Sequence, residues 1–467
     1  MQQIKDIFGA DYSYRAGTIG TVAQKTAYGY VKGYCEEIER PYFSKAYSEV
    51  LSKMCEGVKR TTGQHPGGIV VIPKENEVHD FTPIQYPANN PFSDWLTTHF
   101  AFADLHDNIL KLDILAHVDP TSIRMLSQFS GHHYKDVPMS DPEVYKLFYS
   151  IDSLNISDPK GYYHEKNGAA GLPEFGTHNN RRILAKTQPK TFNELVAFEG
   201  VTHGTDVWTN NAEVLVDKGI CSISEVISCR DDIMTYLISK GMDKKMSFQI
   251  MEKVRKGKGL TAEWIEEMQK HNVPDWYINS CQLIKYMFPK AHAVAYAMNA
   301  VRVGWYKVHC PAAYYAVFFS IRCDAYDIET MIKGVDAVYE RLTQIQTKMA
   351  SNEKISKKEE DLETVLEIAL EMYLRGYHFT NISLQKSQAI NFIIDPDDEY
   401  GIIPSFNSID GLGSAVAYSI VQQRDICPFI SKEDIIKRTQ VNNTQLAFME
   451  KIGVLDGLND ENQLSLF

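Results

Sequence analysis

The sequence predicts an α+β protein whose strands lie near the start of the chain and whose larger remainder is helical. Short apolar runs of β type occur at residues 69–72, 96–100 and 109–115. After Asp119 and Pro120, apolar residues recur at helical spacing instead. A chain of 467 residues is long enough for about three domains of typical size. We expect these domains to span residues 1–125, 126–350 and 351–467.

Composition narrows the class of protein. Hydrophobic residues make up 44% of the chain, which is enough to bury a large core. The first residues are polar, and no apolar run approaches the ~20 residues that span a bilayer. The eight cysteines are scattered without a CxxC pair, which favours reduced thiols over disulfides or a zinc site. These features predict a soluble, cytoplasmic protein without a membrane segment.

Charge is unevenly distributed along the chain. The net charge of −12 taken alone argues against a protein that binds nucleic acid. Between Arg230 and Lys307, however, there are 13 Lys and Arg against 8 Asp and Glu. This local excess of positive charge indicates a region that could bind a polyanion.

The run that contains Asp113 is central to the first domain. Side chains alternate along a strand, so Leu110, Leu112 and Ile114 are expected to face the core. Lys111 and Asp113 would then share the opposite face. A carboxylate on a rigid strand can ligate Mg²⁺, which takes oxygen ligands from one or two carboxylates and from substrate phosphates. The alternative is an aspartate that caps the following turn, which is the more frequent role of an isolated acid.

Two further features are expected near this strand. Residues 15–34 predict a turn of small residues that leads into a helix from about Val22. The apolar runs 69–72 and 96–100 predict two strands that lie beside the strand with Asp113.

A glycine pair precedes the apolar run 69–72. Gly67 and Gly68 could let the backbone approach a ligand closely, with the polar side chains of Gln64 and His65 beside them. A plain turn before a strand is the alternative for such a pair.

The helical region begins with clear local signals. Asp141, followed by Pro and Glu, predicts a helix start. Residues 153–176 are rich in Gly and polar residues and predict a long connection. Residues 198–208 combine hydroxyls, glycines and His203 and predict a loop, for which an ordinary turn with a helix cap is the alternative.

Three basic clusters follow. Arg230 begins a helical pattern, residues 252–259 end another in a Gly-rich cationic cluster, and residues 285–296 lead into a third. Lys and Arg near helix ends suit a triphosphate whose charge must be neutralised during transfer. Solvated helix faces are the alternative for any one cluster taken alone.

The last region combines a linker, helices and a tail. Residues 351–361 predict a charged linker, and the apolar periodicity from Leu362 to Tyr373 predicts a helix that Gly376 ends. Residues 409–415 predict a Gly-x-Gly hairpin that opens a helix and exposes backbone N–H groups to a phosphate. A Gly-rich helix entry is the alternative.

Two further elements follow the hairpin. A second helical pair is expected from residues 431 to 458. The end of the chain, QLSLF, predicts an extended peptide that binds in a groove of a partner, with Leu466 and Phe467 as anchors.

Taken in order, these motifs resemble the C-terminal third of the alpha subunit of PolC-type bacterial DNA polymerase III, a C-family polymerase. The resemblance extends from about Phe8 to Phe467. It is carried by the stretches YRAGTIGTVAQKTAYG, RTTGQHPGGIVVIP, LKLDILAHVDPT, THGTDVW, SCRDDIM, MEKVRKGKGL, KYMFPKAHAVAYAMNAVR, IPSFNSIDGLG and QLSLF.

The resemblance implies a palm of the nucleotidyltransferase type, large helical fingers and a helix-hairpin-helix region that binds duplex DNA. It implies primer-template DNA, deoxynucleoside triphosphates and the bacterial sliding clamp as partners, with Mg²⁺ as cofactor. Asp113 matches the third palm aspartate, a ligand of the catalytic metal ions. The implied triphosphate-binding residues are Arg230, Lys253, Arg255, Lys258, Lys285 and Lys290, with His203, Thr205 and His292 in matching motifs. Gly411 and Gly413 match the hairpin that binds DNA backbone, and Gln463, Leu464, Leu466 and Phe467 match the clamp-binding tail.

The sequence departs from the family in one important respect. The first two palm aspartates belong upstream of Tyr14 and Arg15, and the chain begins too late to contain them. Ala116 stands where a glycine is expected, and Val118 where an acid is expected. We therefore expect the isolated chain to be inactive and an upstream fragment to supply the other aspartates. The alternative is a non-catalytic protein that binds DNA and the clamp.

Overall fold

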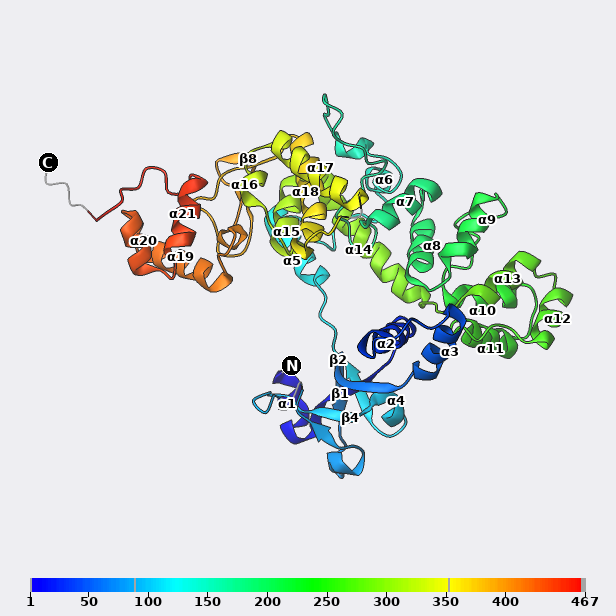
Figure 1. The fold of residues 1–467 in the computed structure, drawn as a ribbon. Coiled ribbons are helices and arrows are strands. Elements are labelled where there is room, and N and C mark those ends of the chain that lie inside the picture. Colours follow the sequence, from blue (N-terminus) through cyan, green and yellow to red (C-terminus); the bar gives the residue numbers. More distant parts are fainter. Residues whose placement is uncertain (1, 88–89, 352, 463–467) are drawn as a thin grey trace, which may run out of the picture. The chain divides into compact units, whose positions relative to one another are not determined.

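The computed structural model describes residues 2–87, 90–351 and 353–462, and it forms two compact units (Figure 1). The first unit is Met1–His117 and the second is Val118–Phe467. The first contains a five-stranded sheet, whereas the second consists largely of helices. The expected α+β class is therefore confirmed.

The sheet of the first unit has the strand order β3-β4-β1-β2-β5. β1 is parallel to β4, and the remaining neighbours are antiparallel. Its core includes Tyr14, Val70 and Ile72. The strands are β1 (Ser13–Thr21), β2 (Lys59–Val71), β3 (Ile84–Gln85), β4 (Thr97–Ala101) and β5 (Leu110–Asp113). The helices are α1 (Gln2–Phe8), α2 (Gln24–Glu37), α3 (Lys45–Cys55) and α4 (Phe102–Leu105), with short 3₁₀ turns at Ala10–Tyr12 and Val78–Asp80.

The small residues that predict a turn lie instead in β1. The helix that follows begins at Gln24, close to the expected start at Val22. A Cβ atom on Gly17 would lie 2.0 Å from the carbonyl oxygen of Thr98 on β4. Glycine is therefore required for β1 to pack against β4. The expectation of a turn is wrong because small residues also allow two backbones to approach closely.

The glycine pair at 67–68 also lies within a strand, since β2 continues from Lys59 to Val71. A Cβ atom on Gly67 would lie 2.4 Å from Cδ2 of Leu115. A Cβ atom on Gly68 would lie 2.9 Å from Cβ of Ala16. A side chain at either position would therefore collide with protein atoms. The two glycines allow the strands to pack closely, and they do not form a loop.

The expected orientation of β5 is wrong. The register places Lys111 opposite Val70, a core residue, so that Lys111 lies on the core face with its side chain 19% exposed. Leu110 and Ile114 are exposed, and Leu112 is half-buried. β5 ends the sheet and neighbours only β2, so β4 does not lie beside it as expected. Alternation of apolar residues does not by itself identify the buried face of such an edge strand.

The second unit is built around one continuous apolar core. Tyr306, Tyr315, Phe148, Phe198 and Phe319 are among its fully buried side chains. A small sheet with the order β6-β8-β7 lies within it, formed by β6 (His378–Phe379), β7 (Ile393–Asp395) and β8 (Asp398–Ile403). No helix among the described residues is long and apolar enough to cross a membrane.

The helices of the second unit fall into three consecutive groups along the chain. The first group is α5 (Asp119–Ser130), α6 (Pro142–Lys146), α7 (His178–Thr187), α8 (Phe192–His203) and α9 (Glu213–Asp217). The second is α10 (Arg230–Ser239), α11 (Lys244–Val254), α12 (Ala262–Lys270), α13 (Asp275–Leu283), α14 (Lys290–His309) and α15 (Pro311–Ile321). The third is α16 (Ile328–Met331), α17 (Val335–Ala350), α18 (Lys357–Leu374), α19 (Ser414–Ile426), α20 (Lys432–Arg438) and α21 (Asn443–Lys451).

Most helical expectations are confirmed. Asp141 caps α6 through its side chain, and residues 155–176 form a connection after a short 3₁₀ turn. Two boundaries differ from expectation. Residues 198–203 form the end of α8 rather than a loop. α18 begins at Lys357, because Ser356 and Glu359 form a capping box there, so the charged stretch is only partly a linker.

Candidate functional site

Asp113 lies at the end of β5, where its carboxylate is half exposed. Its Oδ1 is 3.1 Å from Nζ of Lys111, and the residue lies opposite Gly68 of β2. An exposed carboxylate of this kind fits Mg²⁺ as one oxygen ligand. Among the described residues, however, Asp113 belongs to no group of three or more potential metal ligands. At this position the described residues therefore offer a single carboxylate, whereas a two-metal site needs several.

In the second unit, one short segment between α13 and α14 joins the motifs of the basic region. The Lys285 N–H donates to the carbonyl oxygen of Thr205 at 3.0 Å, and the Met287 N–H donates to that of Arg255 at 3.3 Å. The Arg230 N–H donates to the carbonyl oxygen of Phe288 at 3.1 Å. We call residues 284–290 the bridging segment. It brings together the three basic clusters and the loop after α8, which lie far apart in the sequence.

The six basic candidates divide into two groups by their ion pairs. Arg255 lies 2.6 Å from Glu252, Lys290 lies 2.9 Å from Asp232, and Arg230 lies 4.0 Å from Asp231. The hydrogen bond from Arg255 lowers the pKa of Glu252 to about 2. The other three candidates are exposed lysines that make no ion pair with any residue that the structure describes: Lys253, Lys258 and Lys285.

Aromatic rings contact the bridging segment at Phe288. Phe288 stacks on His292 with 4.6 Å between ring centres, and His292 lies 4.5 Å from Tyr296. His203, at the end of α8, meets Phe288 edge-on at 6.3 Å and lies 6.0 Å from His292. The expected nucleotide residues His203, Thr205 and His292 therefore do lie together.

His203 is held by two carboxyl residues. Its Nε2 lies 2.8 Å from Oε2 of Glu174, and its Nδ1 lies 2.9 Å from the carbonyl oxygen and 3.2 Å from Oε1 of Glu199. Burial opposes the charge of His203, but the hydrogen bond to Glu174 and the nearby Glu199 outweigh it and raise its pKa to about 9. Burial raises the pKa of Glu199, which is fully buried, to about 8. One ligand atom from each of Glu174, Glu199 and His203 lies within 4.8 Å of the other two, so these residues also form a group that could hold a metal ion.

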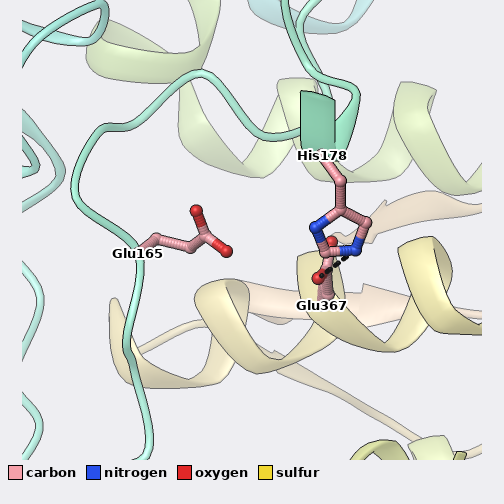
Figure 2. A group of neighbouring side chains, drawn as sticks. All are labelled: Glu165, His178 and Glu367. Carbon is pink, nitrogen blue, oxygen red and sulfur yellow. Dashed lines mark ion pairs between the residues drawn. The ribbon is translucent and has the colours of Figure 1, made fainter. Parts of the chain in front are cut away.

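A second carboxylate and histidine group consists of Glu165, His178 and Glu367 (Figure 2). Nη2 of the buried Arg181 donates to Nδ1 of His178 at 3.1 Å, and it also lies 2.8 Å from Glu367. Because arginine only donates, Nδ1 accepts and Nε2 carries the proton of a neutral ring. Nε2 faces Glu367 at 3.2 Å, so it offers no lone pair to a metal ion. This group links the connection before α7 to α18.

The expected hairpin precedes α19. Gly411 has a positive φ of 75°, and Gly413 is the N-cap of α19. A Cβ atom at either position would meet no atom within 4 Å, so both glycines face open space. They line a cavity of about 820 Å³ together with Lys358 and Asp410. The expected clamp residues Gln463, Leu464, Leu466 and Phe467 lie outside the described residues.

Glu174 and Glu199 are not among the expected site residues. Glu199 precedes His203 by four residues, and such a pair meets on one helix face. This signal is present in the sequence but depends on recognising α8 as a helix. Glu174 lies in an irregular connection, where local sequence indicates no contact with His203.

Three sequence families match the chain. Residues 35–116 match the bacterial DNA polymerase III alpha NTPase domain, and residues 119–272 match the bacterial DNA polymerase III alpha subunit finger domain. Residues 376–464 match a helix-hairpin-helix motif. The first match covers part of the sheet of the first unit, the second covers the chain from α5 to α12, and the third covers the hairpin at Gly411.

Individual relatives agree with these matches. The chain is 52% identical to "DNA polymerase III PolC-type" of Oceanobacillus iheyensis, 53% identical to that of Bacillus subtilis and 50% identical to that of Staphylococcus aureus, each over 463 residues. Each alignment covers 99% of this chain but only 32% of the relative. The chain thus spans about a third of the length of these relatives.

The chain therefore belongs to the bacterial DNA polymerase III alpha subunit family. Within this family it corresponds to a portion, 32% of the length, of the PolC-type polymerases, and it carries their NTPase, finger and helix-hairpin-helix regions. The resemblance inferred from the motifs is confirmed.

Proposed function

We propose that the chain is part of a DNA-directed DNA polymerase that adds deoxynucleotides to a primer 3′ end in the bacterial cytoplasm. In this proposal residues 1–125 belong to the palm, residues 126–350 form the fingers, and residues 351–467 bind duplex DNA and the sliding clamp. The observation that supports it best is the bridging segment, which carries the exposed, unpaired Lys285 and contacts the turn between the exposed, unpaired Lys253 and Lys258. Such a surface suits a nucleoside triphosphate.

The two groups of basic residues have different roles in this proposal. Lys253, Lys258 and Lys285 contact the triphosphate, because no carboxylate of the described chain neutralises them. Lys290 holds the bridging segment in place through its ion pair with Asp232, and the carbonyl oxygen of Arg255 does so by accepting from the Met287 N–H. Both groups are needed, since a phosphate-binding surface works only when its geometry is fixed beforehand.

Asp113 is the one carboxylate that the chain contributes to Mg²⁺ binding in this proposal. When bound, the ions neutralise charge on the triphosphate and activate the attacking hydroxyl. The other acids come from an upstream polymerase fragment, so the isolated chain does not polymerise. Gly411 and Gly413 present backbone N–H groups of α19 to a phosphate of duplex DNA.

Nucleotide binding by the full chain tests the role of the lysines. Lys285→Ala should weaken binding of a deoxynucleoside triphosphate by about tenfold in a calorimetric titration with Mg²⁺. Lys270→Ala is a matched control, because Lys270 is exposed on α12 and pairs with Glu266. Equal affinity of Lys285→Ala and the wild-type chain would refute the assignment.

Primer extension tests the role of Asp113. The purified chain alone should not extend a primed template, whereas a mixture with the upstream fragment should. In the mixture, Asp113→Asn should reduce the rate by orders of magnitude and leave DNA affinity unchanged, since transition-state charge is no longer stabilised. Normal turnover by this variant would leave Asp113 with a structural role only.

The same assay separates the alternative function. The alternative is a non-catalytic protein that binds DNA and the clamp, and it is suggested by the lack of further acids grouped with Asp113 in the described chain. It would be favoured if no upstream fragment restores activity. DNA binding through the Gly411 hairpin without extension in any mixture would support this alternative.

A further inference from the structure

Both ring nitrogens of His203 face acceptors that belong to the protein. Nε2 lies 2.8 Å from Glu174, and Nδ1 lies 2.9 Å from the carbonyl oxygen of Glu199. A nitrogen that faces a hydrogen-bond acceptor must carry a proton to form the bond. A ring with a proton on each nitrogen is an imidazolium. The ring therefore has no free N–H group with which to bind a phosphate directly.

Its surroundings favour this charged form. The side chain of His203 is 22% exposed, and the carboxylate of Glu174 is 35% exposed. The fully buried carboxyl oxygens of Glu199 have no hydrogen-bond donor in the described chain. A buried carboxyl without donors must be neutral or lie beside a cation. The imidazolium, 3.2 Å away, is that cation.

The other charged groups near His203 come from three elements. α14 contributes His292, whose ring stacks on Phe288, and Tyr296, whose ring lies against His292. Arg322, which follows α15 and pairs with Asp119 of α5, adds to the larger effect of His203 in lowering the pKa of Glu174. Arg322 and Asp119 offset each other. Glu174 and Glu199 therefore remain the acids that set the charge of His203.

We propose that His203 is a positioning residue of the nucleotide site, held as an imidazolium between Glu174 and Glu199. This inference rests on the proposed function, because the bridging segment that His203 contacts is the segment that binds triphosphate. The ring keeps its protons throughout the reaction. The two acids offset its charge, while its hydrogen bond to Glu174 and its contact with Phe288 hold the end of α8 next to the bridging segment.

The charge itself can be measured without a nucleotide. In the full chain labelled with ¹⁵N-histidine, long-range ¹H–¹⁵N spectra report the protonation of each imidazole, and loss of one signal in His203→Gln assigns the residue. We expect both nitrogens of His203 to be protonated at neutral pH. Glu174→Gln should lower the pH at which the ring of His203 loses a proton. A neutral ring at neutral pH would overturn the inference.

The consequence for binding is tested with a deoxynucleoside triphosphate and Mg²⁺. His203→Gln should weaken binding about tenfold at neutral pH. Glu174→Gln should bind nearly as well as the wild type in mild acid but should lose affinity as pH rises, at a lower pH than the wild type does, a shift that a purely structural role would not produce. His271→Gln is the matched control, since His271 pairs with Glu267 on another helix, away from the bridging segment.

The two proposals fail in different ways. If the wild-type chain binds no triphosphate, the proposed function falls. If it binds and the pH midpoint of Glu174→Gln equals that of the wild type, only the role of His203 falls. Circular dichroism of each variant identifies a folding defect, and the partly exposed Glu174 provides the variant least subject to one.

Discussion

Nζ of Lys307 lies 2.9 Å from Oε2 of Glu371, and both side chains are completely buried. The ammonium also donates to the carbonyl oxygens of Gly168 and Ala170, at 2.9 and 2.6 Å. Hydroxyls of Tyr163 and Tyr315 donate to Glu371. The pair thus connects α14 and α18 to the irregular connection before α7, which carries Glu174 beside His203.

Removing one partner of this pair should strongly destabilise the second unit. Lys307→Met leaves the Glu371 carboxylate buried without its cation, at an expected cost of about 3–5 kcal/mol in unfolding free energy. Denaturant unfolding measures this cost. The double variant Lys307→Met/Glu371→Leu should lose less than the sum of the single variants. Lys270→Met, in an exposed pair, should cost little, and an equally small cost for Lys307→Met would contradict the prediction.

Close packing of β1 against β4 gives a second prediction. Gly17→Ala should destabilise the first unit by about 1–3 kcal/mol, because the added Cβ would meet the Thr98 carbonyl oxygen. Gly29→Ala in α2 is the matched control, since its Cβ would meet nothing within 4 Å. That control should be stabilised by up to about 1 kcal/mol. Thermal unfolding compares the two, and a neutral Gly17→Ala would show that the strands can separate without cost.

Stability should depend on pH through His203 and Glu199. The pKa of His203 is raised from 6.5 to about 9. Its contribution to the unfolding free energy is therefore complete below pH 6.5 and is lost as pH rises through about 9. The pKa of Glu199 is raised from 4.5 to about 8, so its contribution is likewise lost as pH rises from 4.5 through about 8.

The unfolding free energy should therefore fall by on the order of 2 kcal/mol between neutral pH and about pH 9. Denaturant titrations at a series of pH values measure the slope. The slope should be smaller in Glu199→Gln, whose side chain cannot ionise. A slope of the opposite sign in the wild type would exclude the charged arrangement around His203.

The terminal tail supplies a prediction that needs no catalytic partner. A peptide of residues 459–467 should bind the bacterial sliding clamp with on the order of micromolar affinity, because few apolar anchors must offset the ordering of a flexible peptide. Replacing Leu466 and Phe467 by alanine should abolish binding, while Ser465→Ala should retain it. Calorimetry measures both variants, and binding by the double variant would remove the clamp assignment.

Local sequence signals predict the helices well and the sheet less well. The apolar spacing from Leu362 to Tyr373 corresponds to α18, and Asp141 caps α6 as expected. The buried face of β5 and the position of Gly17 depend on neighbours that are distant in sequence. The small residues from Arg15 to about Val22 therefore predict a turn, although pairing with β2 and β4 places them in a strand.

The sequence likewise predicts only part of the candidate site. The motifs identify His203, Thr205 and His292, and the structure brings them together. Sequence alone does not separate Lys285, which is unpaired, from Lys290, which is paired with Asp232. It also does not reveal Glu174, because a contact between an irregular connection and the end of a helix leaves no periodic pattern.

The position of β5 at the end of the sheet has a practical consequence for the isolated chain. Its outer backbone groups have no strand partner in the described structure, and Leu110, Ile114 and Leu115 beside them are exposed. Such an edge is a template for pairing with another chain. The purified protein should therefore self-associate as its concentration rises, and a lysine in place of Leu110 should keep it monomeric without altering the sheet.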